Sequence, residues 1–278
     1  MSEHPVEKGI AGVVRTYELM DRVRMRQDLV VRDDQFDHEA LLDAVRYAGR
    51  RRIRLSVLDT GRFDLAQVEA LARGGARILT SDDVRPRADE WGILVEAGRS
   101  GGTHLCVLWN GPLPAAGAAS GPTLQALEDL LARGLDFHIS DRTHPRDAGS
   151  LVGLAAAARR GKAYFVLTHV GPLVAELAAP AGHRAWVHFS DAAITDEPGA
   201  ALAIEIARAG VRAGSRAVVH IERGLPLELL EGLWAAGAAL VFLTPPSDDR
   251  SLLRPIERKA LRRKLPARAF YLSTAFLP

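Results

Sequence analysis

The chain has 278 residues, of which 47% are hydrophobic and 25% charged, and its formal net charge is +2. This size suits one large α/β domain, and so small a net charge does not favour nucleic-acid or membrane binding. The single cysteine, Cys106, excludes an intrachain disulfide, a cysteine-rich zinc site and a three-cysteine iron–sulfur motif. No run approaches 18 uninterrupted apolar residues, so we expect a soluble cytoplasmic protein. Its preference for arginine over lysine suggests a GC-rich bacterial genome.

The first 50 residues form the least regular part of the chain. Residues 13–17 and 28–32 could be short strands, and together they suggest a hairpin-like extension. Residues 38–50 read as a helix, because apolar side chains recur near helical spacing at Leu41, Leu42, Val45 and Ala48.

A repeated strand–helix pattern begins after residue 50. Strand-like runs start at intervals of about 27 residues, roughly the size of one compact β/α unit. They begin near Ile53, Arg77, His104, Asp136, Ala163, Ala185, Ala217 and Ala239. Helical segments lie between these runs, and Asp64 and Thr123 stand where N-caps of two of them are expected.

Eight strands that alternate with helices predict a parallel sheet, and closing eight gives a (β/α)8 TIM-type barrel. We expect a single domain over residues 1–278: an N-terminal extension and helix (1–50), the barrel core (51–250) and a C-terminal helix and tail (251–278). An open doubly wound sheet is one alternative. A leucine-rich horseshoe has a similar period, but its regular Leu and Asn positions are missing.

Polar residues share one face in five of the predicted strands, which is unusual for a barrel interior. Because a buried polar group without a partner is costly, these residues must bond one another, water, a ligand or a metal. A hydrogen-bonded polar core without a ligand is the competing interpretation. The residues are Arg54, Ser56, His104, Cys106, His138, Ser140, His188, Ser190, His220 and Glu222.

Reactive groups also stand at the C-terminal ends of the strands, where barrel active sites lie. His169, Asp191 and Glu222 end successive strands, so we expect them to converge as ligands of a divalent metal ion. Asp141 and His144, in the loop DRTHPRD, are expected as catalytic groups beside that ion. His188 and His220, deeper in the barrel, complete the predicted catalytic set. Capping of the following helix is the alternative role for any acidic residue at these positions.

The order THVG, WVHFSD and VVHIE over about residues 163–223 resembles the last three strands of xylose isomerase-like barrels. That resemblance implies a metal held by His, Asp and Glu. The chain departs from the pattern in having a further strand, ALVFLTPP, after HIE. HISD also stands where the family's pattern has a strand ending in glutamate.

Other chemistries have little support. No lysine ends a strand, which argues against Schiff-base and pyridoxal phosphate reactions, and no GxGxxG or GxxxxGK[ST] motif is present. The first functional hypothesis is therefore a barrel enzyme acting on a small polar substrate, as a metal-assisted hydrolase, lyase or isomerase. The second is a non-catalytic barrel that serves as a binding or assembly subunit.

The end of the chain is apolar and aromatic. Phe270, Tyr271, Leu272 and Phe276 are expected to pack on the barrel, on a second copy of the chain or on a partner subunit, because a contiguous apolar patch is rarely solvated.

Overall fold

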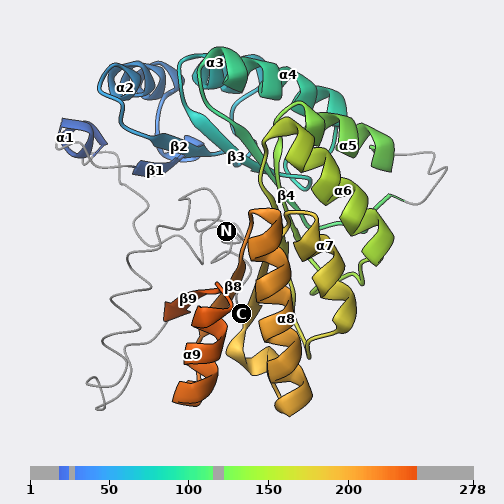
Figure 1. Cartoon of the computed structure of the whole chain (residues 1–278). Coiled ribbons are helices and arrows are strands. Elements are labelled where there is room, and N and C mark those ends of the chain that lie inside the picture. Colours follow the sequence, from blue (N-terminus) through green and yellow to red (C-terminus); the bar gives the residue numbers. More distant parts are fainter. Residues whose placement is uncertain (1–18, 25–28, 115–121, 243–278) are drawn as a thin grey trace.

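The computed structural model describes residues 19–24, 29–114 and 122–242. Within them helices and strands alternate almost without exception (Figure 1). The strands are β1 (Leu29–Arg32), β2 (Leu55–Leu58), β3 (Arg77–Ser81), β4 (Leu105–Trp109), β5 (Asp136–Ser140), β6 (Phe165–Thr168), β7 (Trp186–Ser190), β8 (Ala217–Ile221) and β9 (Ala239–Phe242). The helices are α1 (Leu19–Arg24), α2 (His38–Arg50), α3 (Leu65–Arg73), α4 (Ala88–Ser100), α5 (Leu124–Ala132), α6 (Ala148–Gly161), α7 (Ala178–Gly182), α8 (Glu197–Ala213) and α9 (Leu227–Ala235).

Local sequence signals account for where two of these helices begin. The Asp64 side chain accepts the backbone N–H of Gln67 at 2.8 Å, and the Gln67 side chain accepts that of Asp64, which completes a capping box at the start of α3. Thr123 accepts the N–H of Ala126 at 3.1 Å and caps α5. Both predicted N-caps are therefore confirmed.

The nine strands of the described residues lie parallel in one sheet, in the order β1 to β9, which confirms the predicted β/α-barrel class. β1 pairs in parallel with β2 and so joins the sheet as a strand before the eight that the sequence predicted, while the hairpin expected for it stays a prediction. Residues 13–17, its expected partner, lie outside the described residues. The described pairs run in one series from β1 to β9, and a pair joining β9 to β1 is not among them.

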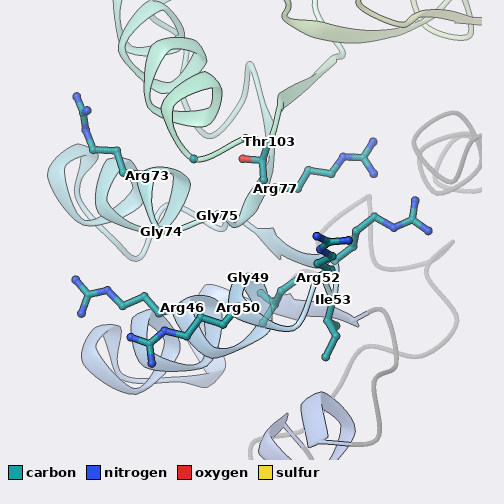
Figure 2. Close-up of a pocket in the computed structure, with 14 residues that line it drawn as sticks. Arg46, Gly49, Arg50, Arg52, Ile53, Arg73, Gly74, Gly75, Arg77 and Thr103 are labelled. Atoms are coloured by element: carbon teal, nitrogen blue, oxygen red, sulfur yellow. The ribbon is translucent and has the colours of Figure 1, made fainter.

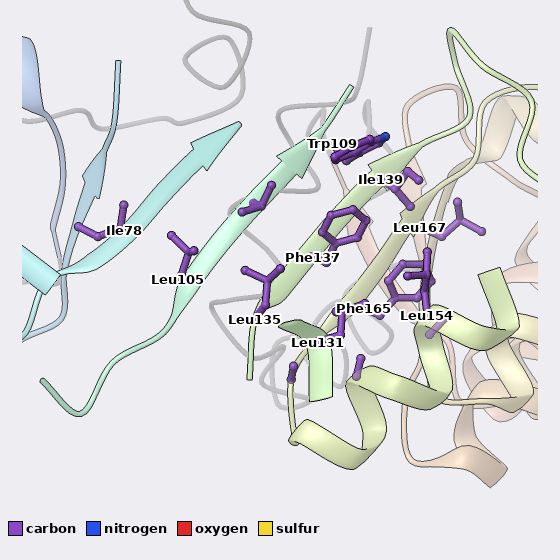
Figure 3. Close-up of a cluster of buried hydrophobic side chains, with 14 of the residues drawn as sticks. Ile78, Leu105, Trp109, Leu131, Leu135, Phe137, Ile139, Leu154, Phe165 and Leu167 are labelled. Atoms are coloured by element: carbon purple, nitrogen blue, oxygen red, sulfur yellow. The ribbon is translucent and has the colours of Figure 1, made fainter. Parts of the chain in front are cut away.

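The helices pack on one face of this sheet. Figure 1 shows them along the outer, convex side of the curve. Strand residues predicted to face helices are buried in one core cluster with the apolar helix positions: Ile53, Leu55, Val107, Ile139, Val187 and Ile221. Figure 3 shows the central part of this core, where the rings of Phe137 and Phe165 stack with their centroids 6.2 Å apart. Alternation along the strands thus predicted the helix-facing side correctly.

The alternate strand residues form the opposite face, which we call the concave face. On this face Leu108 of β4 lies beside His138 of β5, and Thr168 of β6 lies beside His188 of β7. Polar and apolar side chains are therefore neighbours on it. A second, smaller apolar cluster of Val166, Trp186, Val218 and Ala239 also lies on this face. The histidines at 138, 188 and 220 are buried within it. Of the helices described, none is long and apolar enough to cross a membrane.

Candidate functional site

Acidic side chains at the C-terminal ends of the strands bond to neighbouring loops rather than to one another. Asp82, which follows β3, accepts the backbone N–H groups of residues 110 and 111, each at 2.8 Å. Asp191, which follows β7, accepts those of residues 223 and 224, each at 2.9 Å. In both cases the two donors belong to the loop after the next strand. These carboxylates therefore tie adjacent loops together along this edge of the sheet.

Asp59 has the same position after β2 but a side-chain partner. Its Oδ2 accepts the Arg85 Nε–H at 2.5 Å and the Thr80 hydroxyl at 2.8 Å, and all three side chains are buried. Burial works to lower the pKa of Arg85, but the hydrogen bond and charge of Asp59 outweigh it and raise that pKa. The pairing was not predicted from the sequence, although an arginine four residues after the end of β3 is a visible signal.

His169 and Asp141 form a closed pair at the ends of β6 and β5. The His169 Nδ1 lies 2.5 Å from Asp141 Oδ2, and the His169 Nε2 lies 2.9 Å from the carbonyl oxygen of Pro172. Asp141 Oδ1 also accepts the N–H of Val170 at 2.8 Å. Burial works to lower the pKa of His169, but the hydrogen bonds to Asp141 and Pro172 outweigh it and raise that pKa. The Pro172 carbonyl can only accept, so Nε2 carries a hydrogen, and both ring nitrogens are engaged.

The residues expected to bind a divalent metal do not fit that role as the structure places them. His169 has both ring nitrogens bonded to oxygen acceptors, so it presents no lone pair to an ion. Asp191 bonds two backbone N–H groups and the Ser190 hydroxyl. Glu222 is half-buried and has another partner. Within the described ranges no three His, Cys, Asp or Glu side chains gather as a metal site would require.

The loop after β5 contains a residue that sequence reasoning missed. Arg146 donates from Nε and Nη2 to the Ser140 carbonyl at 2.9 and 2.8 Å, and from Nη1 to the Gly111 carbonyl at 2.7 Å. Burial lowers its pKa against the opposing charges of Asp141 and Asp82. Arg146 therefore braces this loop, in which the predicted catalytic residue His144 is half-buried.

Buried histidines lie together on the concave face, at the middle of β7 and one residue before the end of β8. His188 Nδ1 and His220 Nε2 are 3.1 Å apart, and the two ring centroids are 5.4 Å apart. His138 on β5 lies near enough to act electrostatically on His188. The structure thus brings together the two deeper histidines that the sequence predicted as catalytic, and adds His138.

Both imidazoles of the pair are neutral at physiological pH. Burial lowers the pKa of His220 to about 4. Burial, followed by repulsion from His220 and His138, lowers the pKa of His188 well below its usual value. Charge on either ring is therefore disfavoured while the face stays dry.

The pair and the neighbouring Thr168 form a cluster in which three polar atoms have no hydrogen-bond partner among the described residues. They are the outer ring nitrogens, His188 Nε2 and His220 Nδ1, and the hydroxyl oxygen Thr168 Oγ1. An unmet buried hydrogen bond costs about 1–3 kcal/mol, so this cluster is suited to a bound polar molecule.

The hydrogen bond between the two rings dictates what the outer nitrogens offer. If His188 Nδ1 donates, His188 Nε2 carries a lone pair and His220 Nδ1 carries a hydrogen; if His220 Nε2 donates, these assignments reverse. In either tautomer the pair presents one donor and one acceptor. Such a pair can give a proton at one end and take one at the other.

No protein-family model matches the chain, and no curated protein matches it. Among solved structures it is similar to a deoxyribose phosphate aldolase from Aeropyrum pernix, at 14% identity over 92% of this chain and 98% of that one, with a TM-score of 0.30. It is also similar to a Mg-complexed beta-methylaspartase from Clostridium tetanomorphum, at 13% identity over 89% of this chain and 55% of that one (TM-score 0.34). An N-acetylneuraminic acid synthetase from Leptospira borgpetersenii is similar at 14% identity over 89% and 88% of the two chains (TM-score 0.28). At these identities and scores the comparisons specify neither a family nor a reaction.

Proposed function

We propose that the protein is an enzyme that moves protons on a small polar substrate bound at the concave face, as an isomerase or a lyase. The observation that carries this proposal is the 3.1 Å contact between His188 and His220, whose outer nitrogens have no partner among the described residues. His220 is the last residue but one of β8 and His188 the middle residue of β7, so the pair lies below the C-terminal edge at which barrel enzymes react.

The proposed step keeps every proton accounted for. A substrate C–H or O–H gives its proton to the outer nitrogen that carries a lone pair. The proton between the rings shifts along their hydrogen bond, and the other outer nitrogen gives its proton to an acceptor atom of the substrate. The two rings exchange tautomers and stay neutral throughout, which suits a site where burial holds the pKa of His220 at about 4.

Other predicted residues would serve the mouth of the site. Asp141, bonded to His169 and Val170, would hold the loops after β5 and β6 in place. His144, half-buried in the loop after β5, would be a polar contact for the substrate. Arg146, which bonds two backbone carbonyls, would keep that loop from opening.

A divalent metal ion plays no part in this step, because the expected ligands do not fit one as they are placed. The metal-assisted hydrolase hypothesis therefore requires Asp191 and His169 to release their present partners. A rise in melting temperature on adding Mn²⁺, Zn²⁺ or Mg²⁺, lost in Asp191→Asn, would restore that hypothesis.

Deuterium exchange tests the proton-transfer proposal. Small hydroxy-ketones, sugars and hydroxy acids are first screened by thermal shift, and binders are incubated with the enzyme in D₂O. NMR should then show deuterium entering the carbon next to the carbonyl or carboxyl group. His188→Asn and His220→Asn should slow this exchange by roughly 10²–10⁴-fold, the usual contribution of a positioned acid–base group.

His183→Asn is the matched control. His183 is an exposed histidine, and its Nδ1 lies 2.9 Å from the Ala179 carbonyl at the other edge of the sheet, so exchange should be unchanged. Substrate binding without exchange would instead support the non-catalytic binding subunit.

A further inference from the structure

A groove lined by arginine lies at the N-terminal edge of the sheet, opposite the edge that carries the candidate site. It has a volume of about 800 Å³. Its lining comes from the last turns of α2 and α3, from the loops that follow α2, α3 and α4, and from the first residues of β2 and β3. Glycines of the connecting loops form part of its floor. Its basic residues are Arg46, Arg50, Arg52, Arg54, Arg73 and Arg77 (Figure 2).

The positive charge in this groove is only partly balanced, and Arg54 and Arg77 have partners of their own. No carboxylate is among the described residues that line it. Arg73 pairs with Glu69 at 2.7 Å, and Arg46 lies 3.9 Å from Asp43. For Arg50 and Arg52, both exposed, the described part of the chain contains no ion-pair partner.

A neighbouring groove of about 810 Å³ provides an internal comparison. It is lined by four acidic residues, and its arginines, Arg73 and Arg133, pair with Glu69 and Glu96 at 2.7 and 3.0 Å. Both arginines of this second groove are thus paired with acid, whereas Arg50 and Arg52 of the first groove have no ion-pair partner among the described residues.

Stabilisation of helix ends explains only part of the cluster. Arg50 and Arg73 lie in the last turns of α2 and α3, where a cation offsets the helix dipole. Arg52 follows α2 and Arg77 lies in β3, so neither is a helix residue. Arg77, mostly buried and 4.0 Å from Asp136, contributes less charge to the surface.

Arg52 also stands where glycine would be the ordinary residue. Its φ is 58°, and the corresponding positions after α3 and α4 are Gly75 and Gly102, with φ of 107° and 71°. A residue other than glycine is disfavoured in this left-handed region. Lys162, after α6, has a φ of 56° but does not line the groove.

We propose that this groove binds a small anion that carries two or more linked phosphate groups. Figure 2 shows Arg46, Arg50 and Arg73 reaching to one side and Arg77 to the other. The guanidinium groups are therefore spread over a width that suits several linked phosphates better than one. Guanidinium groups match phosphate in geometry and charge. No aromatic side chain is among the described lining residues, so the ligand is recognised through its phosphates and not through a base.

Titration calorimetry with inorganic tripolyphosphate tests this proposal on the full chain. Tripolyphosphate should bind one per chain and at least about tenfold more tightly than orthophosphate, since each added charge-assisted hydrogen bond strengthens binding. ATP should bind within about threefold of tripolyphosphate, because no side chain in the groove would stack on adenine.

Arg52→Gly separates binding from stability. It removes one guanidinium and relieves the left-handed backbone, so tripolyphosphate affinity should fall about tenfold while the melting temperature stays equal or rises. Lys162→Gly, the matched control with the same backbone conformation outside the groove, should leave affinity unchanged.

The proposal is overturned if tripolyphosphate affinity is the same in wild type, Arg52→Gly and Arg50→Gln. It is also overturned if a 20-nucleotide oligo(dT) binds while tripolyphosphate does not, which would make the groove a nucleic-acid surface. Since Arg52 precedes β2 at the N-terminal edge of the sheet and His188 lies at the middle of β7 on the concave face, this result is independent of the deuterium-exchange experiment.

Discussion

At the scale of single residues, burial determines the protonation of His188 and His220. Their rings contact each other, and the pair has no carboxylate partner that would stabilise a charged ring. The cost of moving a charged imidazole out of water therefore lowers both pKa values. His169 shows the opposite balance, because hydrogen bonds to Asp141 and Pro172 outweigh its burial. The pKa values of histidines in one sheet are thereby shifted in opposite directions.

The pKa of His220 predicts a loss of stability in mild acid. The unfolded chain binds a proton near pH 6.5 but the folded chain only near pH 4, so the unfolded state holds more protons between these values. The free energy of unfolding should therefore fall as the pH drops from about 6.5 to about 4, by about 3 kcal/mol for His220 alone. Urea unfolding at pH 7.5, 6.0 and 5.0 measures this slope.

His220→Gln should flatten that slope, and an equal slope in the variant would contradict the assignment. His169 affects the free energy of unfolding in the opposite direction. Its pKa is raised, so it contributes stability that is present below pH 6.5 and is lost as the pH rises through its pKa in the folded protein. Stability should therefore be greatest near neutrality, and His169→Gln should remove part of the alkaline loss.

At the scale of elements, every helix from α2 to α9 ends in the same way. A residue with positive φ turns the chain from helix toward the next strand, which is the left-handed termination described for helix C-termini. Five of these eight residues are glycine and three are basic: Arg52, Gly75, Gly102, Gly134, Lys162, Arg184, Gly214 and Gly237. The repeat is thus a repeat of turns as well as of strands.

Close packing of these turns predicts the effect of Gly101→Ala. A Cβ built at Gly101 would lie 2.1 Å from the carbonyl oxygen of Ala72, a backbone atom of the preceding turn. The substitution should therefore destabilise the protein by about 1–3 kcal/mol, the usual range for overpacking. Thermal unfolding followed by circular dichroism measures the shift.

Gly182→Ala is the control for this substitution, because a Cβ at Gly182 would meet nothing within 4 Å. It should be neutral or slightly stabilising, since alanine favours helix. Equal destabilisation by the two variants would show that turn packing is not the cause.

At the scale of the whole molecule, the charges are separated although the net charge is only +2. Helices run opposite to the strands, so helix N-termini and strand C-termini share one edge. Aspartates cap α3, α6 and α8 there, beside Asp82 and Asp191. At the other edge arginine occupies the last turn of α2, α3, α4, α6 and α8. The helix dipole favours both placements, and together they leave one edge acidic and the other basic.

The apolar end of the chain lies outside the described residues, and its role stays a prediction. Deleting residues 269–278 removes Phe270, Tyr271, Leu272 and Phe276. If these side chains cover the barrel or a second copy, the deletion should lower the melting temperature or reduce the mass measured by light scattering. A variant with both quantities unchanged would show that the segment contributes to neither contact.

The sequence by itself determined the elements and their faces. Alternation placed the beginnings of β2 to β9 within two residues, and it separated helix-facing residues such as Ile139 and Val187 from His138 and His188 on the other face. It also located the caps at Asp64 and Thr123. These features depend on neighbours close in the chain and on whether a side chain is buried, and periodicity reports both.

Only the tertiary structure decided which groups meet. Asp191 was expected to face a metal ion, but the loop after β8 brings two backbone N–H groups to its carboxylate. His169 was expected to be a ligand, but the turn to Pro172 occupies its second nitrogen. The arginines of the basic groove come from three consecutive units and gather only because parallel strands bring their N-terminal ends to one edge. The course of a loop depends on contacts between residues distant in the chain, and no local pattern of residue types encodes those contacts.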